Sequence, residues 1–304
     1  MWPFSEDEPG VAGGGPVVPQ ERNGPTTDGD RSVRRSRTVP QVGPPPERTE
    51  VSEAGPLDAP RWSVRLLRIL TLTPLLRAVV ATESVPPGQP RRQDCPSCAA
   101  PVGLDGGTGV LLPRGRCDRC GTRVGAPALL VELAVVVAGV GLVLAGQPIL
   151  TTLAFAWWAG CAVALTFVDV AVHRLPDRLT WTATAGTWAL LALAALLGEE
   201  PTRWVRALIA GTALAALFAA STLLLGRRGF GLGDAKLVLS SGAVLGWLGW
   251  GVLVGGLLLT FMASAVCALA MMAAGRVRWS GHLPFGPFIV LGTFAAIVVH
   301  GGVG

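Results

Sequence analysis

The sequence predicts an all-α fold, a polytopic membrane bundle of about seven transmembrane helices with a small metal-binding segment and a disordered N-terminal tail. Of its 304 residues, 50% are hydrophobic and 15% are charged, whereas a soluble domain carries about a quarter charged residues. The apolar residues are also concentrated in one part of the chain. Residues 1–126 are polar and rich in Pro, Gly and Arg, whereas residues 127–303 are almost continuously apolar, which indicates a membrane domain.

The N-terminal part divides into a tail and a basic segment. Residues 1–60 have no apolar periodicity and many Pro, Gly, Ser and charged residues, a composition typical of disorder. Residues 61–93 form a basic amphipathic or linker segment, in which four arginines interrupt the apolar residues: Arg61, Arg65, Arg68 and Arg77. An arginine at the centre of a span costs about 2.5–3.5 kcal/mol, so we expect a helix that lies at the membrane surface.

Seven apolar segments follow within residues 127–303, the predicted transmembrane domain. Six of them have the roughly 17–25 residues of a membrane-spanning helix, and segment 235–249 is shorter. In lipid such segments must be helical because their backbone finds no water. Their approximate bounds are 127–146, 149–168, 179–198, 204–226, 235–249, 250–274 and 284–302.

Basic residues predict the orientation of the bundle. They are frequent before the first apolar segment and recur after the second, fourth and sixth segments, which are the loops that return to one side. Because such loops are cytoplasmic in most membrane proteins, we expect this side to face the cytoplasm. Because the basic residues of the membrane domain follow one side of the bundle, we expect the helices to contact the lipid bilayer. The same distribution argues against a nucleic-acid partner.

Four cysteines in residues 94–123 form a paired motif, with Cys95 and Cys98 separated by eighteen residues from Cys117 and Cys120. Four thiolates at this spacing can bind Zn²⁺ in a closed tetrahedron, which is a structural site rather than a catalytic one. The alternative is a pair of disulfides. Thiols stay reduced in the cytoplasm, so the predicted orientation favours zinc.

Two aspartates mark the same side of the bundle. Asp169 ends the second apolar segment and Asp234 precedes the fifth, and the chain crosses the membrane twice between them. Two close carboxylates share one proton, so one can activate a water while the other polarises a peptide carbonyl. The alternative is that both are ordinary loop acids near the lipid headgroups.

The residues around these aspartates are also informative. Gly231 and Gly233 precede Asp234, and glycine lets a backbone bend and approach a substrate closely. Pro176 and Asp177 follow the first aspartate and indicate the start of the third helix, where we expect Asp177 to be the N-cap.

Together these motifs resemble the bacterial prepilin peptidases, also called type IV leader peptidases, over about residues 94–300. The resemblance rests on the paired cysteines and on five short stretches, Val131–Leu133, Phe167–Asp169, Leu175–Thr180, Gly231–Leu237 (a GxGDxKL motif) and Pro284–Phe288.

The resemblance implies a membrane aspartyl endopeptidase of the bacterial plasma membrane. Such enzymes remove the basic leader of type IV prepilins or pseudopilins, after a glycine and on the cytoplasmic side. By match, Asp169 and Asp234 would be the catalytic pair. Five neighbours would support substrate binding or the motif: Gly231, Gly233, Lys236, Pro176 and Asp177.

Two alternative functions follow from the same residues. Many members of the family also methylate the new N-terminus with S-adenosylmethionine, but the Arg-rich residues 61–81 stand here in place of the apolar span that usually precedes the cysteines. The second alternative is a zinc-bearing assembly factor without enzymatic activity, which would need the cysteines and the helices but not the aspartates.

Overall fold

The computed structural model describes residues 72–86, 88–102, 115–198, 201–226, 230–275 and 284–303, and these belong to one compact unit. The predicted disordered tail, residues 61–71 of the basic segment and residues 103–114 of the cysteine segment lie outside the described residues. Within them the secondary structure is helical, apart from two isolated β-bridges, Asp94 with Pro101 and Arg116 with Arg123.

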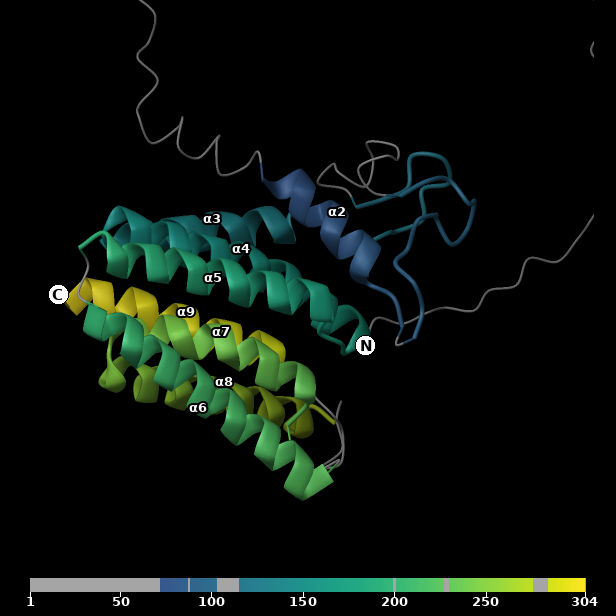
Figure 1. Ribbon diagram of the computed structural model, residues 1–304. Coiled ribbons are helices and arrows are strands. Elements are labelled where there is room, and N and C mark those ends of the chain that lie inside the picture. Colours follow the sequence, from purple (N-terminus) through teal and green to yellow (C-terminus); the bar gives the residue numbers. More distant parts are fainter. Residues whose placement is uncertain are drawn as a thin grey trace, which may run out of the picture. The chain divides into compact units, whose positions relative to one another are not determined.

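A short helix, α2 (Thr73–Glu83), precedes seven longer ones that match the seven predicted apolar segments one by one (Figure 1). Among the described residues, α4, α5, α6 and α8 are long and apolar enough to cross a membrane, and α3 and α9 are shorter apolar helices. The predicted all-α bundle is therefore confirmed. The bounds are α3 Leu130–Leu144, α4 Ile149–Val172, α5 Asp177–Leu196, α6 Pro201–Leu225, α7 Leu232–Leu248, α8 Trp250–Ala273 and α9 Gly286–Val303.

The end of α4 differs from the sequence expectation. The apolar segment was expected to end at residue 168, but the helix continues to Val172. It ends where His173 adopts a left-handed conformation with φ of 51° and donates its N–H to the carbonyl of Asp169 at 2.8 Å, a common helix stop. Asp169, which was expected at the end of this segment, therefore lies inside the last turn of α4.

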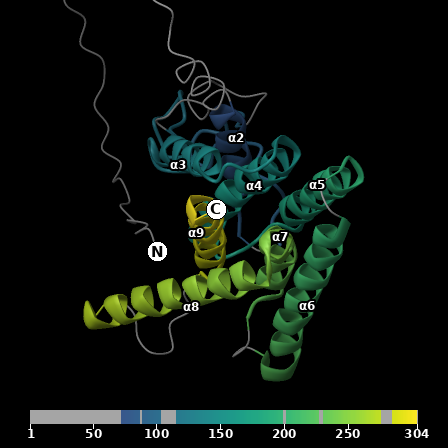
Figure 2. The same cartoon turned by 90° about the vertical axis from the view of Figure 1, so that its left-hand side faces the viewer.

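Helix α7 forms the centre of the bundle, with α5, α6, α8 and α9 around it (Figure 2). It packs most extensively on α6, and two glycines make this possible. A Cβ at Gly211 of α6 would lie 2.6 Å from the carbonyl of Leu239, and one at Gly242 of α7 would lie 3.0 Å from Cα of Gly211. Small residues at such crossings let two membrane helices approach backbone to backbone.

Helix α8 is central only in its first half. Its buried residues are Leu253, Gly256 and Thr260, and its second half extends away from the other helices (Figure 2). The large apolar side chains of that half, among them Met262 and Val266, are exposed in the chain by itself, as expected for a surface that faces lipid.

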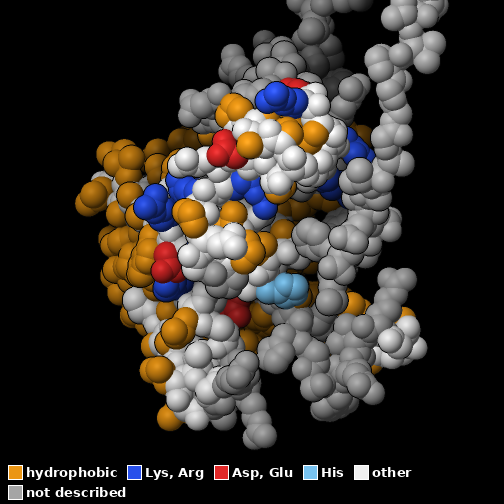
Figure 3. Space-filling model, turned by 90° about the vertical axis from the view of Figure 1, so that its right-hand side faces the viewer, with side chains coloured by type: hydrophobic (Ala, Val, Ile, Leu, Met, Phe, Trp, Pro, Cys, Tyr) orange, Lys and Arg blue, Asp and Glu red, His pale blue; other side chains and the backbone are white. Residues whose placement is uncertain are grey.

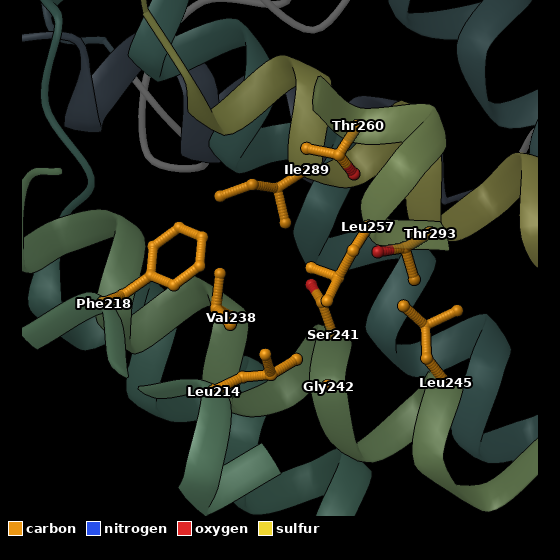
Figure 4. Close-up of a pocket in the computed structure, with 10 residues that line it drawn as sticks. All are labelled: Leu214, Phe218, Val238, Ser241, Gly242, Leu245, Leu257, Thr260, Ile289 and Thr293. Atoms are coloured by element: carbon orange, nitrogen blue, oxygen red, sulfur yellow. The ribbon is translucent and has the colours of Figure 1, made fainter. Parts of the chain in front are cut away.

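One small cavity lies between α6, α7, α8 and α9 (Figure 4). Its volume is about 10 Å³, which corresponds to one water molecule at most. Hydroxyls of Ser241, Thr260 and Thr293, from three different helices, point toward its middle (Figure 4). A cavity of this size holds no ligand larger than water.

Helix α2 packs against α3 and α4, and a buried ion pair joins it to α3. Arg77 is 2% exposed, and its Nε and Nη2 donate to the two carboxylate oxygens of Glu132 at 2.6 and 2.5 Å. The sequence analysis counted Arg77 among the arginines of a surface helix, whereas the structure buries it. The reason is an acid 55 residues away in the chain, which a reading of the local pattern cannot supply.

Candidate functional site

Asp169 and Asp234 lie in the last turn of α4 and the first turn of α7, and each accepts one backbone hydrogen bond. Gly286 N, at the start of α9, donates to Asp169 Oδ2 at 3.2 Å. Gly231 N donates to Asp234 Oδ2 at 3.1 Å, because a side chain in the first helical turn can reach back to the residue before the helix. Asp169 is buried and Asp234 is half-buried.

The two carboxylates converge at one end of the bundle. The side chain of Leu175 lies beside both motifs, since a Cβ at Gly233 would lie 3.2 Å from its Cβ and a Cβ at Gly286 would lie 3.6 Å from its Cδ2. Four stretches of chain, at the ends of α4, α5, α7 and α9, therefore meet around the two acids.

Gly286 approaches Asp169 so closely that no side chain fits between them. A Cβ at this position would lie 2.7 Å from Asp169 Oδ2, shorter than any ordinary carbon–oxygen contact. The sequence analysis used the surrounding Pro284–Phe288 stretch only for the resemblance and gave it no role. The available signal that its backbone lies against a site was a single glycine, Gly286, with a Pro-Phe pair on either side.

Four phenylalanine rings pack together, and two of them directly precede the donor glycines. They are Phe218 of α6, Phe230 before α7, Phe261 of α8 and Phe285 before α9. Phe218 stacks on Phe230 with ring centroids 4.4 Å apart, and Phe230 and Phe285 are 5.0 Å apart. Phe261 lies 6.0 Å from Phe230 and 5.6 Å from Phe285. We call this set the phenylalanine cluster. Sequence reasoning missed it because its members come from four separate segments.

Asp177 does not cap α5, so the predicted N-cap role is wrong. Pro176 occupies the N-cap position and no side chain caps the helix. Asp177 is instead the first residue of α5, and its Oδ1 accepts a hydrogen bond from Lys236 Nζ at 2.6 Å. Because Lys236 belongs to the first turns of α7, this exposed ion pair joins the two motifs that carry the aspartates.

The four cysteines come together as the spacing predicts. Two pairs of sulfurs, Cys95 with Cys120 and Cys98 with Cys117, are 3.6 Å apart, and all four sulfurs lie within 4.8 Å of one another. Zn–S bonds of about 2.3 Å in a tetrahedron require sulfurs about 3.8 Å apart. All the cysteines are free, which contradicts the alternative of two disulfides.

The chemistry of the cysteine cluster also fits a metal. The Thr122 hydroxyl and N–H lower the pKa of the Cys120 thiol to about 6. The Ala100 N–H acts in the same direction on Cys98, but burial and the neighbouring sulfurs outweigh it and raise the pKa of Cys98 to about 12. Four thiolates this close repel one another, so a bound divalent cation is what would ionise them all.

The cysteine segment lies on the same side as the aspartates. Its buried core includes Ala81 of α2, and Arg92 N donates to the Thr82 carbonyl at 2.9 Å. Arg174, five residues after Asp169, donates to the carbonyl of Pro86 at 3.4 Å. Figure 3 shows this side of the molecule, where the charged side chains gather and the apolar side chains recede to the flank.

Comparison with known proteins identifies similar chains. A model of the type IV leader peptidase family matches residues 153–273, a range that includes both aspartates. A protein of Aeromonas hydrophila named prepilin leader peptidase/N-methyltransferase is 32% identical over 212 residues, which cover 68% of this chain and 71% of that protein. A protein of the same name from Burkholderia pseudomallei (strain K96243) is 33% identical over 218 residues, 68% of this chain and 66% of that protein. No solved structure matches the chain.

Proposed function

Because the chain belongs to the type IV leader peptidase family, we propose that it removes the basic leader of type IV prepilins or pseudopilins at the cytoplasmic face of the bacterial plasma membrane. Membership confirms the resemblance drawn from the sequence and the expectation of an aspartic-type endopeptidase. The cleavage position after a glycine, the substrate class and the side of the membrane are the parts that we propose.

The observation that carries the proposal is the convergence of Asp169 and Asp234 at one end of the bundle, each held by a backbone N–H. We assign the peptidase domain to residues 127–303 and both catalytic carboxylates to it. We propose that the neighbouring residues support substrate binding. They are Gly231, which binds Asp234, Gly233, Pro176, and the ion pair of Lys236 with Asp177.

The two carboxylates divide the chemistry of peptide hydrolysis between them. The ionised carboxylate takes a proton from water, whose oxygen attacks the scissile carbonyl carbon, while the protonated carboxylate donates to the carbonyl oxygen. A tetrahedral diol forms, a proton passes to the leaving nitrogen, and the C–N bond breaks. The shared proton belongs to the pair, so neither aspartate has a fixed role.

Coexpression with a prepilin tests this mechanism. The substrate should carry a basic leader, a glycine and an apolar helix, and the ratio of precursor to mature protein is read from its mass. Asp169→Asn and Asp234→Asn should each abolish maturation, because one carboxylate cannot supply both acid and base. Glu199→Gln, an acid between the third and fourth apolar segments, is the control and should mature the substrate normally.

The same experiment decides between an enzyme and an assembly factor. A scaffold would need the helices and the cysteines but not the acids. Maturation at the wild-type rate by either aspartate variant would therefore refute the peptidase and leave the non-enzymatic alternative.

We further propose that Zn²⁺ binds the four cysteines and has a structural role. Four protein ligands leave no open position for water or substrate, and two of them are buried in the core beneath α2. Elemental analysis of the purified protein should find about one zinc per chain. Cys95→Ser should lose it, and Cys161→Ser, which changes a cysteine of α4, should retain it; a full equivalent in the first variant would refute the site.

The names of the relatives include a second activity, N-methyl transfer. We propose that this chain acts as a peptidase alone, because its sequence departs from the family pattern in residues 61–81, ahead of the cysteines. Membranes that contain the protein should be incubated with labelled S-adenosylmethionine and a cleaved pilin. Label on the pilin N-terminus would show the bifunctional alternative to be right.

A further inference from the structure

We infer that Phe230 and Phe285 are positioning residues, whose packed rings hold the two catalytic carboxylates at their working separation. The inference deepens the proposed function and rests on it. It concerns what keeps the carboxylates of Asp169 and Asp234 at a constant distance, although they lie on different helices.

The two acids need a connection other than their own helices. Asp169 is on α4 and Asp234 is on α7, and these two helices pack against each other only slightly. Helix ends that are not in contact can shift relative to each other. The separation of the carboxylates therefore depends on groups that reach both motifs. Leu175 is one such group, and the ring pair of Phe230 and Phe285 is another.

The backbone donors supply the first half of that connection. Phe230 immediately precedes Gly231, whose N–H is bound by Asp234. Phe285 immediately precedes Gly286, whose N–H is bound by Asp169. Each acid is therefore attached to the backbone next to one of the two rings.

The rings supply the second half. Their centroids are 5.0 Å apart with planes inclined by 43°, a separation typical of attractive aromatic pairs. Because each ring is one residue from a donor, contact between the rings limits how far apart the two N–H groups can lie. The chain of contacts runs from Asp234 through Gly231 and the two rings to Gly286 and Asp169.

Neighbouring helices hold the ring pair in place. Phe218, which is 3% exposed, stacks on Phe230 from α6, and Phe261 contacts both rings from α8. The Thr222 hydroxyl of α6 also donates to the carbonyl of Phe230. The pair is thus enclosed on two sides, and its position is determined by the packing of α6 and α8.

A double-mutant cycle on cleavage kinetics tests the inference. Phe230→Leu, Phe285→Leu and the double variant are assayed as full-length protein in detergent, on a prepilin peptide that spans the cleavage site. A misplacement of about 1 Å between reacting groups costs about 100-fold in rate, so each single variant should lose about 10- to 100-fold in kcat. KM should stay within about twofold, and the double variant should be no slower than the slower single one, because both changes break the same connection.

Two further variants separate positioning from general stability. Phe294→Leu changes another phenylalanine of α9, one that packs against Gly141 of α3, and its kcat should equal that of the wild type. Phe285→Tyr keeps the ring and should recover most of the kcat that Phe285→Leu loses. Thermal unfolding of each variant shows that the protein remains folded.

Several outcomes would overturn the inference. Additive losses in the double variant would mean that the rings act separately, and a raised KM with normal kcat would mean that they bind substrate. An equal loss in Phe294→Leu, or no recovery in Phe285→Tyr, would also contradict positioning by the ring pair. Failure of the proposed function would look different, because Asp169→Asn would then cleave the peptide as fast as the wild type.

Discussion

The ion pair between Arg77 and Glu132 predicts a large effect from the loss of one carboxylate. The guanidinium donates to both carboxylate oxygens at 2.6 and 2.5 Å, the two-pronged geometry that makes arginine–carboxylate pairs strong. It also reaches the carbonyls of Ala126 and Pro127 at 3.5 and 3.4 Å. In Glu132→Leu the buried guanidinium would lose both of its hydrogen bonds to the carboxylate and the negative charge of Glu132.

The size of the effect follows from burial. The side chains of Arg77 and Glu132 are 1% and 14% exposed, and removal of one partner from a buried ion pair costs about 3–5 kcal/mol. Because Glu132 keeps some access to solvent, we expect about 3 kcal/mol, which corresponds to about a 100-fold change in an equilibrium constant. Helix α2 has only 11 residues and lies at the edge of the bundle, so the cost should appear as local opening of α2.

Hydrogen exchange measured by mass spectrometry reads this opening directly. Amides of residues 73–83 should exchange about 100-fold faster in Glu132→Leu, while amides of the central helix α7 should exchange as in the wild type. A second variant, Arg77→Met combined with Glu132→Leu, removes both charges. Since apolar residues can replace a buried ion pair at little cost, its exchange should return to within about tenfold of the wild type.

Two results would refute this reasoning. If Glu132→Leu left the exchange of residues 73–83 within about threefold of the wild type, the ion pair would not hold α2 in place. If the double variant exchanged as fast as the single one, the loss would come from the shape of the side chains rather than from the missing carboxylate charge.

Three further predictions concern single side chains. Gly286→Ala should push the carboxylate of Asp169 aside, since the new Cβ would lie 2.7 Å from it. We expect kcat to fall about 100-fold, while the helix content measured by circular dichroism stays unchanged. A normal kcat would contradict the geometry. Gly211→Ala should cost about 1–3 kcal/mol through overpacking against α7 and lower Tm, whereas Gly160→Ala, where a Cβ would meet nothing within 4 Å, should not. Lys236→Ala removes an exposed ion pair with α5 worth about 0.2–1 kcal/mol, so a fall in Tm beyond about 3 °C would show a larger structural role.

Much of the fold could be predicted because it depends on local chemistry. Long apolar runs must be helical in a membrane, and each of the seven predicted segments overlaps one of the helices α3 to α9 over most of its length. The bounds were less accurate, as at Asp169, because a helix end depends on the conformation of single residues such as His173. The four cysteines could be predicted to lie together because they form two close pairs in one short segment, joined by a single loop. Their proximity therefore depends little on how the helices pack.

The parts of the site that could not be predicted depend on contacts between distant segments. Asp177 was expected to cap its own helix, but it binds Lys236, 59 residues later. The phenylalanine cluster joins side chains from four segments, and the donor to Asp169 lies 117 residues away in the chain. Such contacts depend on how the helices rotate and cross, and a hydrophobic pattern does not specify this when nearly every face is apolar.

The sequence by itself determined the helical segments, the side of the membrane expected for the acids and the cysteines, and the residues able to perform hydrolysis. Only the tertiary structure decided that Arg77 is buried against Glu132, that Gly231 and Gly286 donate to the two aspartates, and that two rings connect these donors. The physical reason is that helix formation and ligand spacing depend on neighbours along the chain. The register between helices depends instead on the packing of side chains that folding brings together.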